Sequence, residues 1–349
     1  MGRKLKAQST LIIAEAGVNH NGSMDIARKM VDAAVDAGAD AVKFQTFQAG
    51  KLVTTNADKA RYQVENTGTS ESQIEMLRRL ELSPNIHKDL FAYCRQKNIL
   101  FLSTPFDEES ADMLDDLGMD IFKISSGEIT NKPLIQYIAY KKKPIILSTG
   151  MSYLGEVENA INWIDEIWNT MVQKPQLSVL HCVSSYPARI EDVNLRAIKT
   201  MKMAFGLPVG YSDHTMGTEI TIAAVAMGAK VIEKHFTLDR DMEGPDHKAS
   251  LEPEELGAMV TAIRNVERAM GDGVKKPTKS EIDLKKVMRR SLVTARDIKA
   301  GETMLSGDIL IKRPGTGIPA EFKDKIVGMQ LKSDISVDSV IRWEDLKHA

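Results

Sequence analysis

Val209–Thr215 reads VGYSDHT, Ile232–Arg240 reads IEKHFTLDR, and Glu243–Pro253 reads EGPDHKASLEP. The first two segments place a histidine, His214 and His235, just past the ends of two apolar, β-like runs that lie about one helix apart. Two neutral imidazoles at adjacent strand ends are suitable ligands for a divalent metal. The same spacing also fits histidines that only hydrogen-bond the nearby backbone, so the rest of the chain has to decide.

Eight short apolar runs recur along the chain, with helical patterns between and after them. They are continuous rather than alternating, as in parallel strands that are buried on both faces. The runs are Thr10–Ala14, Ala41–Gln45, Ile99–Ser103, Ile121–Ile124, Pro144–Ser148, Leu177–Cys182, Pro208–Ser212 and Val231–His235. Eight β-runs that alternate with helices predict an α/β fold, a (β/α)8 TIM barrel.

The pattern changes from Lys275 onward. We predict a barrel domain at 1–274, a polar linker at 275–289, and a small domain of short strands and turns at 290–349. A domain of that size buries a modest share of its surface, so we expect it to dock against something. Within the barrel, residues 49–79 form the longest interruption and are predicted to be an extended loop of the active site.

Composition excludes several classes of protein. The 349 residues are 43% hydrophobic and 27% charged, which is typical of a soluble globular protein. A net charge of −2 argues against broad binding to nucleic acid or anionic membranes. Two cysteines cannot form a disulfide framework, and no apolar run reaches the roughly 18 residues of a membrane span. Met1–Gln8 is basic but no apolar signal sequence follows, so we expect a cytoplasmic protein.

Polar side chains gather at the carboxyl ends of the predicted strands, where barrels carry their chemistry. A buried lysine is costly without an anionic partner. The strand lysines are Lys43, Lys123 and Lys234, and the serines near them are Ser126, Ser148 and Ser212. Any one lysine could pair with a glutamate as a structural contact, but the set predicts a pocket for a doubly charged anion such as a phosphate ester. Glu15, Glu128 and Glu233 either neutralise the lysines or act on substrate hydroxyls.

The two histidines add a metal to this phosphate-binding site. A ligand set of two histidines and few carboxylates suits Mn, Co, Fe or Zn better than Mg. Asp213, next to His214, is a candidate ligand or a candidate orienting group for a ligand.

Nine short blocks run in order along nearly the whole chain. They are Ile13–Gly22 (IAEAGVNHNG), Val42–Thr46 (VKFQT), Ser103–Phe106 (STPF), Lys123–Glu128 (KISSGE), Leu147–Met151 (LSTGM), Tyr211–Thr215 (YSDHT), Glu233–Thr237 (EKHFT), Gly244–His247 (GPDH) and Lys312–Gly315 (KRPG). Together they resemble the sialic acid synthase family. Some members of that family carry Asn where Ser184 stands.

The resemblance implies a TIM barrel followed by a C-terminal SAF (antifreeze-like) domain, in a homodimer whose SAF domain caps the partner's barrel. It implies metal-dependent condensation of phosphoenolpyruvate with an N-acetylmannosamine-type sugar and water, by C–O cleavage, to give N-acetylneuraminate and phosphate. The alternative sugar is 2,4-diacetamido-2,4,6-trideoxymannose, which gives N,N'-diacetyllegionaminate. The two sugars differ mainly at C4 and C6, with hydroxyls in one and acetamido or methyl groups in the other.

The resemblance also implies roles for individual residues. Those implied to bind phosphoenolpyruvate are Lys43, Thr104, Lys123, Ser126, Ser148, Ser184, Tyr186 and Ser212. Those implied to contact the sugar are Gln45, Phe106, Glu128, Asp246 and, from the second domain of the other subunit, Arg313. His214 and His235 would hold the metal, Mn²⁺ first with Mg²⁺ or Co²⁺ as alternatives, and Glu15 would manage the proton or the attacking water.

Two other functions stay open from the sequence. One is another phosphoenolpyruvate–aldose synthase that makes a seven- or eight-carbon acid phosphate, although such enzymes generally lack a SAF domain. The other is a carbohydrate-binding protein that uses its antifreeze-like tail, which leaves the lysines at the barrel mouth unexplained.

Overall fold

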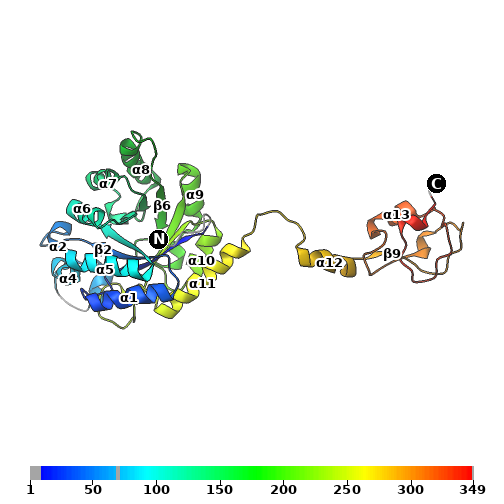
Figure 1. The fold of residues 1–349 in the computed structure, drawn as a ribbon, viewed down its shortest axis with the longest axis horizontal. Coiled ribbons are helices and arrows are strands. Elements are labelled where there is room, and N and C mark those ends of the chain that lie inside the picture. The colour runs from blue at the N-terminus through cyan, green and yellow to red at the C-terminus, as the bar shows by residue number, and fades with distance from the viewer. Residues whose placement is uncertain (1–8, 68–70, 348–349) are drawn as a thin grey trace. The chain divides into compact units, whose positions relative to one another are not determined.

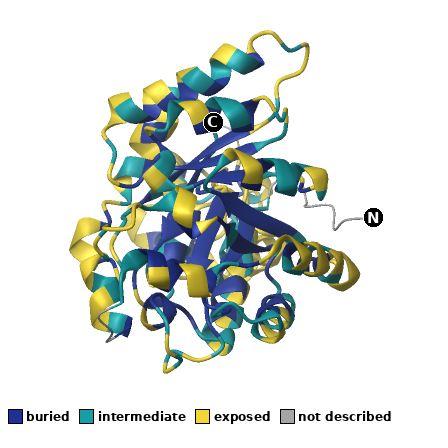
Figure 2. Cartoon of the chain, turned by 90° about the vertical axis from the view of Figure 1, so that its left-hand side faces the viewer, coloured by how far each residue is buried: buried dark blue, intermediate teal, exposed yellow. Residues whose placement is uncertain are grey.

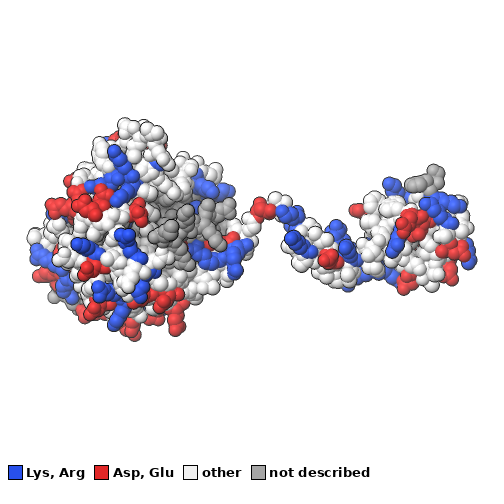
Figure 3. Space-filling view, in the orientation of Figure 1, with Lys and Arg blue, Asp and Glu red and all other residues white. Residues whose placement is uncertain are grey.

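A computed structural model describes residues 9–67 and 71–347, so the basic segment Met1–Gln8 lies outside the described residues. The chain divides into two compact units, Met1–Gly271 and Asp272–Ala349, which Figure 1 shows as a barrel and a smaller body. On the face of the first unit shown in Figure 3, acidic and basic side chains are interspersed. Among the described residues, no helix combines the length and the apolar character that crossing a membrane requires.

The first unit contains eight parallel strands in the order β3-β2-β1-β8-β7-β6-β5-β4. Strands β3 and β4, at the two ends of this order, also lie against each other, so the barrel is nearly closed. The strands are β1 Leu11–Gly17, β2 Ala41–Thr46, β3 Leu100–Pro105, β4 Phe122–Ile124, β5 Ile145–Ser148, β6 Leu177–Cys182, β7 Val209–Asp213 and β8 Val231–His235. Each overlaps one predicted apolar run, which confirms the predicted barrel.

Helices surround the barrel, with buried residues toward the strands and exposed residues outward (Figure 2). They are α1 Met24–Asp36, α5 Pro84–Lys97, α6 Glu108–Asp116, α7 Lys132–Ala139, α8 Leu154–Trp168, α9 Arg196–Phe205, α10 Glu219–Ala226 and α11 Pro253–Ala269. Short 3-10 turns are η1 Ser126–Glu128, η2 Ile190–Asp192 and η3 His247–Ala249 in this unit, and η4 Ser306–Asp308, η5 Ala320–Phe322 and η6 Trp343–Asp345 in the second.

The segment after β2 differs from the prediction, because it is not an extended loop. It holds three short helices, α2 Ala49–Leu52, α3 Arg61–Thr67 and α4 Gln73–Leu80. Ser72 caps the N-terminus of helix α4, since its side chain accepts from the Glu75 amide. The helix buries four apolar residues in a small separate core with Phe47. The abundant charged residues lie on the exposed side, and each helix is too short for its periodicity to stand out.

Alternate residues of each strand point into the barrel. The first inward layer is an apolar cluster built from Leu11, Ile13, Ala41, Leu102, Ile146, Leu180 and Val231. Further along the strands the same inward positions carry polar residues: Glu15, Lys43, Thr104, Lys123, Ser148, Cys182, Ser212 and Glu233. We call these eight residues the polar layer. The apolar layer closes the barrel below it, so ligands reach the polar layer from the carboxyl ends of the strands.

The second unit has its own core, which includes Leu292, Ile298, Ile309 and Ile341. Its elements are α12 Lys279–Met288, the antiparallel pair β9 Ser291–Thr294 and β10 Ile309–Lys312, and α13 Lys323–Ile326. Helix α12 lies within the segment predicted to be a linker, so that segment is partly helical.

Candidate active site

Two lysines and two glutamates form a buried ion-pair network in the polar layer. The Lys43 ammonium lies 2.7 Å from Glu15 Oε2 and donates to Thr104 Oγ1 at 3.0 Å. Glu233 bridges the two lysines, since its carboxylate oxygens lie 3.7 Å from Lys43 Nζ and 3.5 Å from Lys123 Nζ. All five side chains are buried. Buried ammonium groups tolerate such a position because the carboxylates offset their desolvation.

The two carboxylates of this network titrate in opposite directions. Burial raises the pKa of Glu15, and the opposing charge of Lys43 offsets that effect only in part. Burial also acts on Glu233, but Lys123 and Lys43 outweigh it and lower the pKa of Glu233. Two nearby carboxyl groups whose environments push their pKa values apart are typical of acid–base sites. Glu233 therefore stays ionised, whereas Glu15 is the group that readily gains or loses a proton.

Serine hydroxyls surround the lysines. Ser212 donates to Glu233 Oε1 at 3.1 Å, and the Ser126 hydroxyl accepts from the Gly150 amide at 2.9 Å. The buried Ser148 hydroxyl has no hydrogen-bond partner in the described part of the chain. Because buried polar groups are normally hydrogen-bonded, an unpartnered hydroxyl in the same layer as two ammonium groups indicates a place for an anionic ligand.

Gly150 brings the ends of β5 and β6 into close contact. A Cβ added to Gly150 would lie 2.2 Å from Ser184 Oγ and 2.8 Å from Cys182 Sγ. Cys182 Sγ also lies 3.1 Å from Ser126 Oγ, so a thiol lines the pocket together with the predicted hydroxyls and ammonium groups. Cys182 is not among the predicted site residues, although its inward position follows from its spacing of two from Leu180.

His214 and His235 come together at the rim of the polar layer, with ring centroids 5.6 Å apart. The Nδ1–H of His214 donates to the Val183 carbonyl at 2.6 Å, which leaves Nε2 with its lone pair. His235 Nδ1 is buried without a hydrogen-bond partner among residues 9–67 and 71–347. Burial lowers the pKa of both imidazoles, so both are neutral near pH 7.

Two neutral, inward-facing histidines fit a divalent metal. They do not complete a site by themselves, because the described ranges hold no group of three or more His, Cys, Asp or Glu side chains suited to a metal. The remaining ligands would be water or substrate oxygens, as in a metal site with open positions.

Of the predicted sugar contacts, Gln45 contacts the polar layer directly, whereas Glu128 and Phe106 contact other residues. Gln45 donates to Glu15 Oε1 at 3.4 Å, and Asp246 is buried with an unpartnered Oδ1. Glu128, in η1, accepts from Asn131 at 2.7 Å and is half-buried. Phe106 packs edge-on against Phe47 at 6.1 Å between ring centroids.

Two other predicted ligand contacts have different surroundings. The Tyr186 ring lies 4.2 Å from the His214 ring and 5.7 Å from the His235 ring, so it covers the histidine pair. Arg313 lies in the second unit, where its Nε donates to the Met288 carbonyl at 3.1 Å.

Lys234 and Asp213 correct the prediction of three lysines at the mouth. The Lys234 ammonium donates to Asp213 Oδ2 at 2.8 Å and to the Thr215 carbonyl at 2.6 Å, with both charged side chains fully buried. Glu233 and His235 point into the barrel, so Lys234 between them points outward. Asp213 is therefore committed to Lys234 and to the Thr215 amide at 2.9 Å, not to a metal.

Replacing Lys234 by methionine is expected to destabilise the barrel by about 3–5 kcal/mol, because Asp213 would remain buried without its counter-ion. Urea unfolding measures this, with Lys230→Met as the control, since Lys230 is exposed in the turn before the same strand. Equal stability of the two variants would show that the Lys234–Asp213 pair is not structural.

Asp246 gives a pH-dependent prediction, because burial raises its pKa from 3.8 to about 6. The folded chain therefore holds this proton more tightly than the unfolded chain. The contribution of Asp246 to the free energy of unfolding rises as the pH falls from about 6 toward 3.8. Relative to Asp246→Asn, the wild type should gain about 3 kcal/mol between about pH 8 and about pH 3. Urea unfolding of both proteins across this range tests it, and a difference that stays constant with pH would contradict it.

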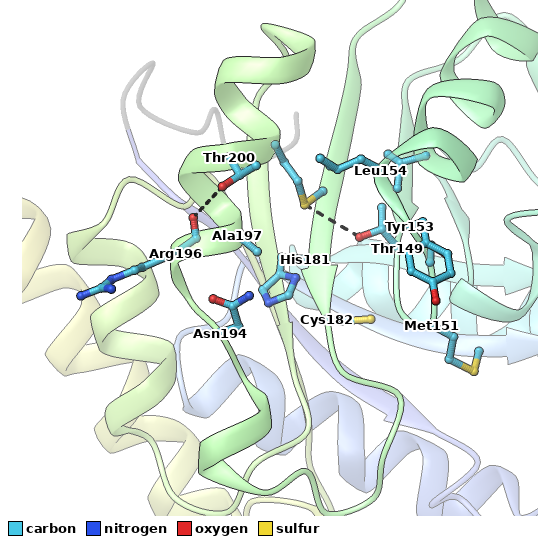
Figure 4. A pocket seen from close by; sticks show the side chains of 13 residues that line it. Thr149, Met151, Tyr153, Leu154, His181, Cys182, Asn194, Arg196, Ala197 and Thr200 are labelled. Atoms are coloured by element: carbon cyan, nitrogen blue, oxygen red, sulfur yellow. Dashed lines mark hydrogen bonds between the residues drawn. The ribbon is translucent and has the colours of Figure 1, made fainter.

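A separate cavity of about 620 Å³ lies beside the mouth, between the start of α8 and α9 (Figure 4). Figure 4 shows His181 and Cys182 at its centre, with Tyr153 on one side and Arg196 on the other. The His181 imidazole Nε2–H donates to the Val193 carbonyl at 2.6 Å. Cys182 belongs to both this cavity and the polar layer. The predicted site residues are not among the residues that line the cavity.

Comparison with known proteins decides the family. The NeuB family matches residues 30–275 and the SAF domain matches residues 289–347.

This chain belongs to the NeuB family.

Similar proteins extend over nearly the whole chain. The N,N'-diacetyllegionaminic acid synthase of Campylobacter jejuni is 50% identical, over 96% of this chain and 99% of that protein. The protein of the same name from Legionella pneumophila is 46% identical, over 98% and 96%. The crystal structure of N-acetylneuraminic acid synthetase from Leptospira borgpetersenii, in complex with citrate, is 37% identical with a TM-score of 0.69, covering 79% of this chain and 90% of that one.

These findings confirm the predicted family and enzyme class. The NeuB-family chain is a nonulosonic acid synthase that uses phosphoenolpyruvate and a sugar. Its polar layer has the two ammonium groups and the hydroxyls that such a phosphate ester needs.

Proposed function

We propose that this NeuB-family chain condenses phosphoenolpyruvate with 2,4-diacetamido-2,4,6-trideoxymannose and water, giving N,N'-diacetyllegionaminate and phosphate. The observation that carries the choice of sugar is the 46–50% identity, nearly end to end, with two proteins named N,N'-diacetyllegionaminic acid synthase. N-acetylmannosamine is the first sugar that the sequence resemblance implies, and these relatives favour the alternative sugar.

Phosphoenolpyruvate would bind in the polar layer. Lys43 and Lys123 supply positive charge there, and the Ser148 hydroxyl supplies an unused hydrogen-bonding group. Ser126, Ser184 and the other predicted hydroxyls complete the pocket. Fixed ammonium groups in a water-poor site stabilise the charge that grows on the departing phosphate.

His214 and His235 would hold a divalent metal, Mn²⁺ in our proposal, through their neutral nitrogens. When bound, the metal polarises the aldehyde oxygen of the open-chain sugar. The hydrogen bond to Val183 fixes the His214 ring and its tautomer. The Tyr186 ring covers both imidazoles and excludes water from this side of the reacting aldehyde.

The reaction forms one C–C bond and breaks one C–O bond. The C3 carbon of phosphoenolpyruvate attacks the sugar aldehyde, and water adds to C2 to give a tetrahedral phosphohemiketal. That species expels phosphate by breaking the bond between C2 and the bridging oxygen. Glu15, whose pKa is raised by burial, takes the proton of the attacking water and gives it to the sugar alkoxide. When the C–O bond breaks, the hydroxyl proton of the phosphohemiketal leaves with the phosphate.

We also propose the homodimer that the resemblance implies. Arg313 would then reach the N-acetyl group of a sugar in the other subunit's barrel. Its loop is already held in place within the second unit, because Gly315 N donates to the Lys286 carbonyl at 2.8 Å and Ser291 Oγ donates to the Pro314 carbonyl at 2.7 Å.

Competition between the two sugars tests the proposed function. One preparation is given phosphoenolpyruvate, Mn²⁺ and equal amounts of both sugars, and the nine-carbon acids are identified by mass spectrometry. The diacetamido sugar should supply nearly all of the product. Excess N-acetylneuraminate would refute the choice of sugar, and phosphate release with erythrose or arabinose phosphate instead would indicate the other class of aldose synthase.

A further inference from the structure

Helix α3 brings a second aromatic ring to the barrel mouth that the sequence analysis did not single out. The Tyr62 ring lies 5.1 Å from the Tyr186 ring and tilted by 31° to it. Tyr186 in turn packs on His214 at 4.2 Å. The side-chain amide of Asn66, one turn further along α3, donates to the Pro245 carbonyl at 2.6 Å, which fixes the helix beside Asp246.

We propose that Tyr62 forms an apolar wall of the sugar pocket and determines the preference for a sugar that lacks hydroxyls at C4 and C6. This inference rests on the proposed function, because it assigns part of that same site.

Tyr62 is half-buried. Its ring neighbour is Tyr186, and its hydroxyl accepts from Gln63 at 3.4 Å. Burial and the Asp246 carboxylate raise the pKa of Tyr62, so the phenol stays neutral. Asp246 is buried with an unpartnered Oδ1, which is a polar atom available to a ligand on this side of the mouth.

Tyr62 is placed for the sugar rather than for phosphoenolpyruvate. The phosphate ester belongs with Lys43 and Lys123 inside the barrel, and the sugar aldehyde belongs at the histidine pair. Tyr62 packs on Tyr186, which itself covers the histidine pair. A sugar whose aldehyde lies at the histidines and whose other carbons extend out of the barrel therefore passes Tyr186 and Tyr62. The far end of the open-chain sugar, C4 to C6, therefore meets α3.

The chemistry of the two sugars gives the wall its selectivity. The diacetamido sugar presents a methyl at C6 and an acetamido methyl at C4, which pack against the face of an aromatic ring. N-acetylmannosamine presents hydroxyls at both positions, and the face of a ring gives them no strong hydrogen bond. A hydrophobic pocket discriminates by about 10- to 200-fold for one methyl-sized group.

Tyr62→Ala and Tyr62→Phe test the inference through kcat/KM for each sugar. The alanine variant should lose about tenfold or more for the diacetamido sugar, mainly in KM, but at most about threefold for N-acetylmannosamine. The phenylalanine variant should keep the wild-type ratio, because it keeps the ring. Tyr140→Ala is the control, since Tyr140 is exposed at the end of α7.

Results of two kinds would overturn the inference. One is an equal loss for both sugars, or a raised KM for phosphoenolpyruvate, in Tyr62→Ala. The other is a changed sugar ratio in Tyr62→Phe, which would give the role to the hydroxyl. A wild type that prefers N-acetylmannosamine would refute the proposed function, and an unchanged preference in the two variants would refute the role of Tyr62 separately.

Discussion

Replacing Lys43 by methionine is expected to lower kcat/KM for phosphoenolpyruvate by about a thousandfold, the largest effect we expect of any single lysine. The variant removes the ammonium group that lies 2.7 Å from Glu15 and donates to Thr104. The positive charge that stabilises the departing phosphate is lost with it. A steady-state assay of phosphate release measures it. Lys230→Met, outside the site, should keep wild-type activity.

The loss has to be separated from the effect of leaving Glu15 buried without its partner. The double variant Lys43→Met, Glu15→Gln removes both charges, so its fold should recover, as followed by urea unfolding. Activity should stay low in the double variant. Recovery of activity together with stability would show that neither Lys43 nor Glu15 takes part in the reaction and that the pair is structural.

Replacing His235 by alanine is expected to abolish turnover and to weaken Mn²⁺ binding by at least about a hundredfold. Its imidazole has an unpartnered, buried Nδ1 and lies beside His214, the other neutral nitrogen of the pair. Loss of a mere outer-shell partner of a metal already costs about 10- to 100-fold in affinity. Titration of Mn²⁺ by electron paramagnetic resonance measures binding without relying on activity.

His181→Ala is the matched control for His235. His181 also ends a strand, but its ring donates to the Val193 carbonyl on the outer side of the barrel, so Mn²⁺ affinity should be unchanged. Full turnover of His235→Ala, after chelation and return of Mn²⁺, would refute the proposed metal site.

The barrel and most of its polar layer were predictable because strands have a strong signal. Each apolar run was long enough to mark a strand, and polar residues at strand ends meet at one end of a barrel. Lys43, Lys123, Ser148 and Ser212 came together for that reason. The prediction for Lys234 was wrong, although the alternation of side chains along a strand determines its direction, since a residue between two inward-facing neighbours must point outward.

Other features had little signal in the sequence. Helices α2 to α4 are short and carry many charges, so their periodicity was weak and their turns resembled a loop. Tyr62 lies on α3 and meets Tyr186 only because α3 packs near the segment after β6, which is far away in the chain. The identity of the sugar depends on the shape of that packing, which no pattern of residues in the sequence encodes.

The most direct test of the reaction uses phosphoenolpyruvate labelled with oxygen-18 in the bridge between carbon and phosphorus. The enzyme, Mn²⁺ and the diacetamido sugar are added to it. The phosphate and the nine-carbon acid are then analysed by mass spectrometry. We expect the label to leave with the phosphate, because water attacks C2 and the C–O bond breaks. Label retained in the nine-carbon acid would mean that the P–O bond breaks, and it would contradict the proposed mechanism.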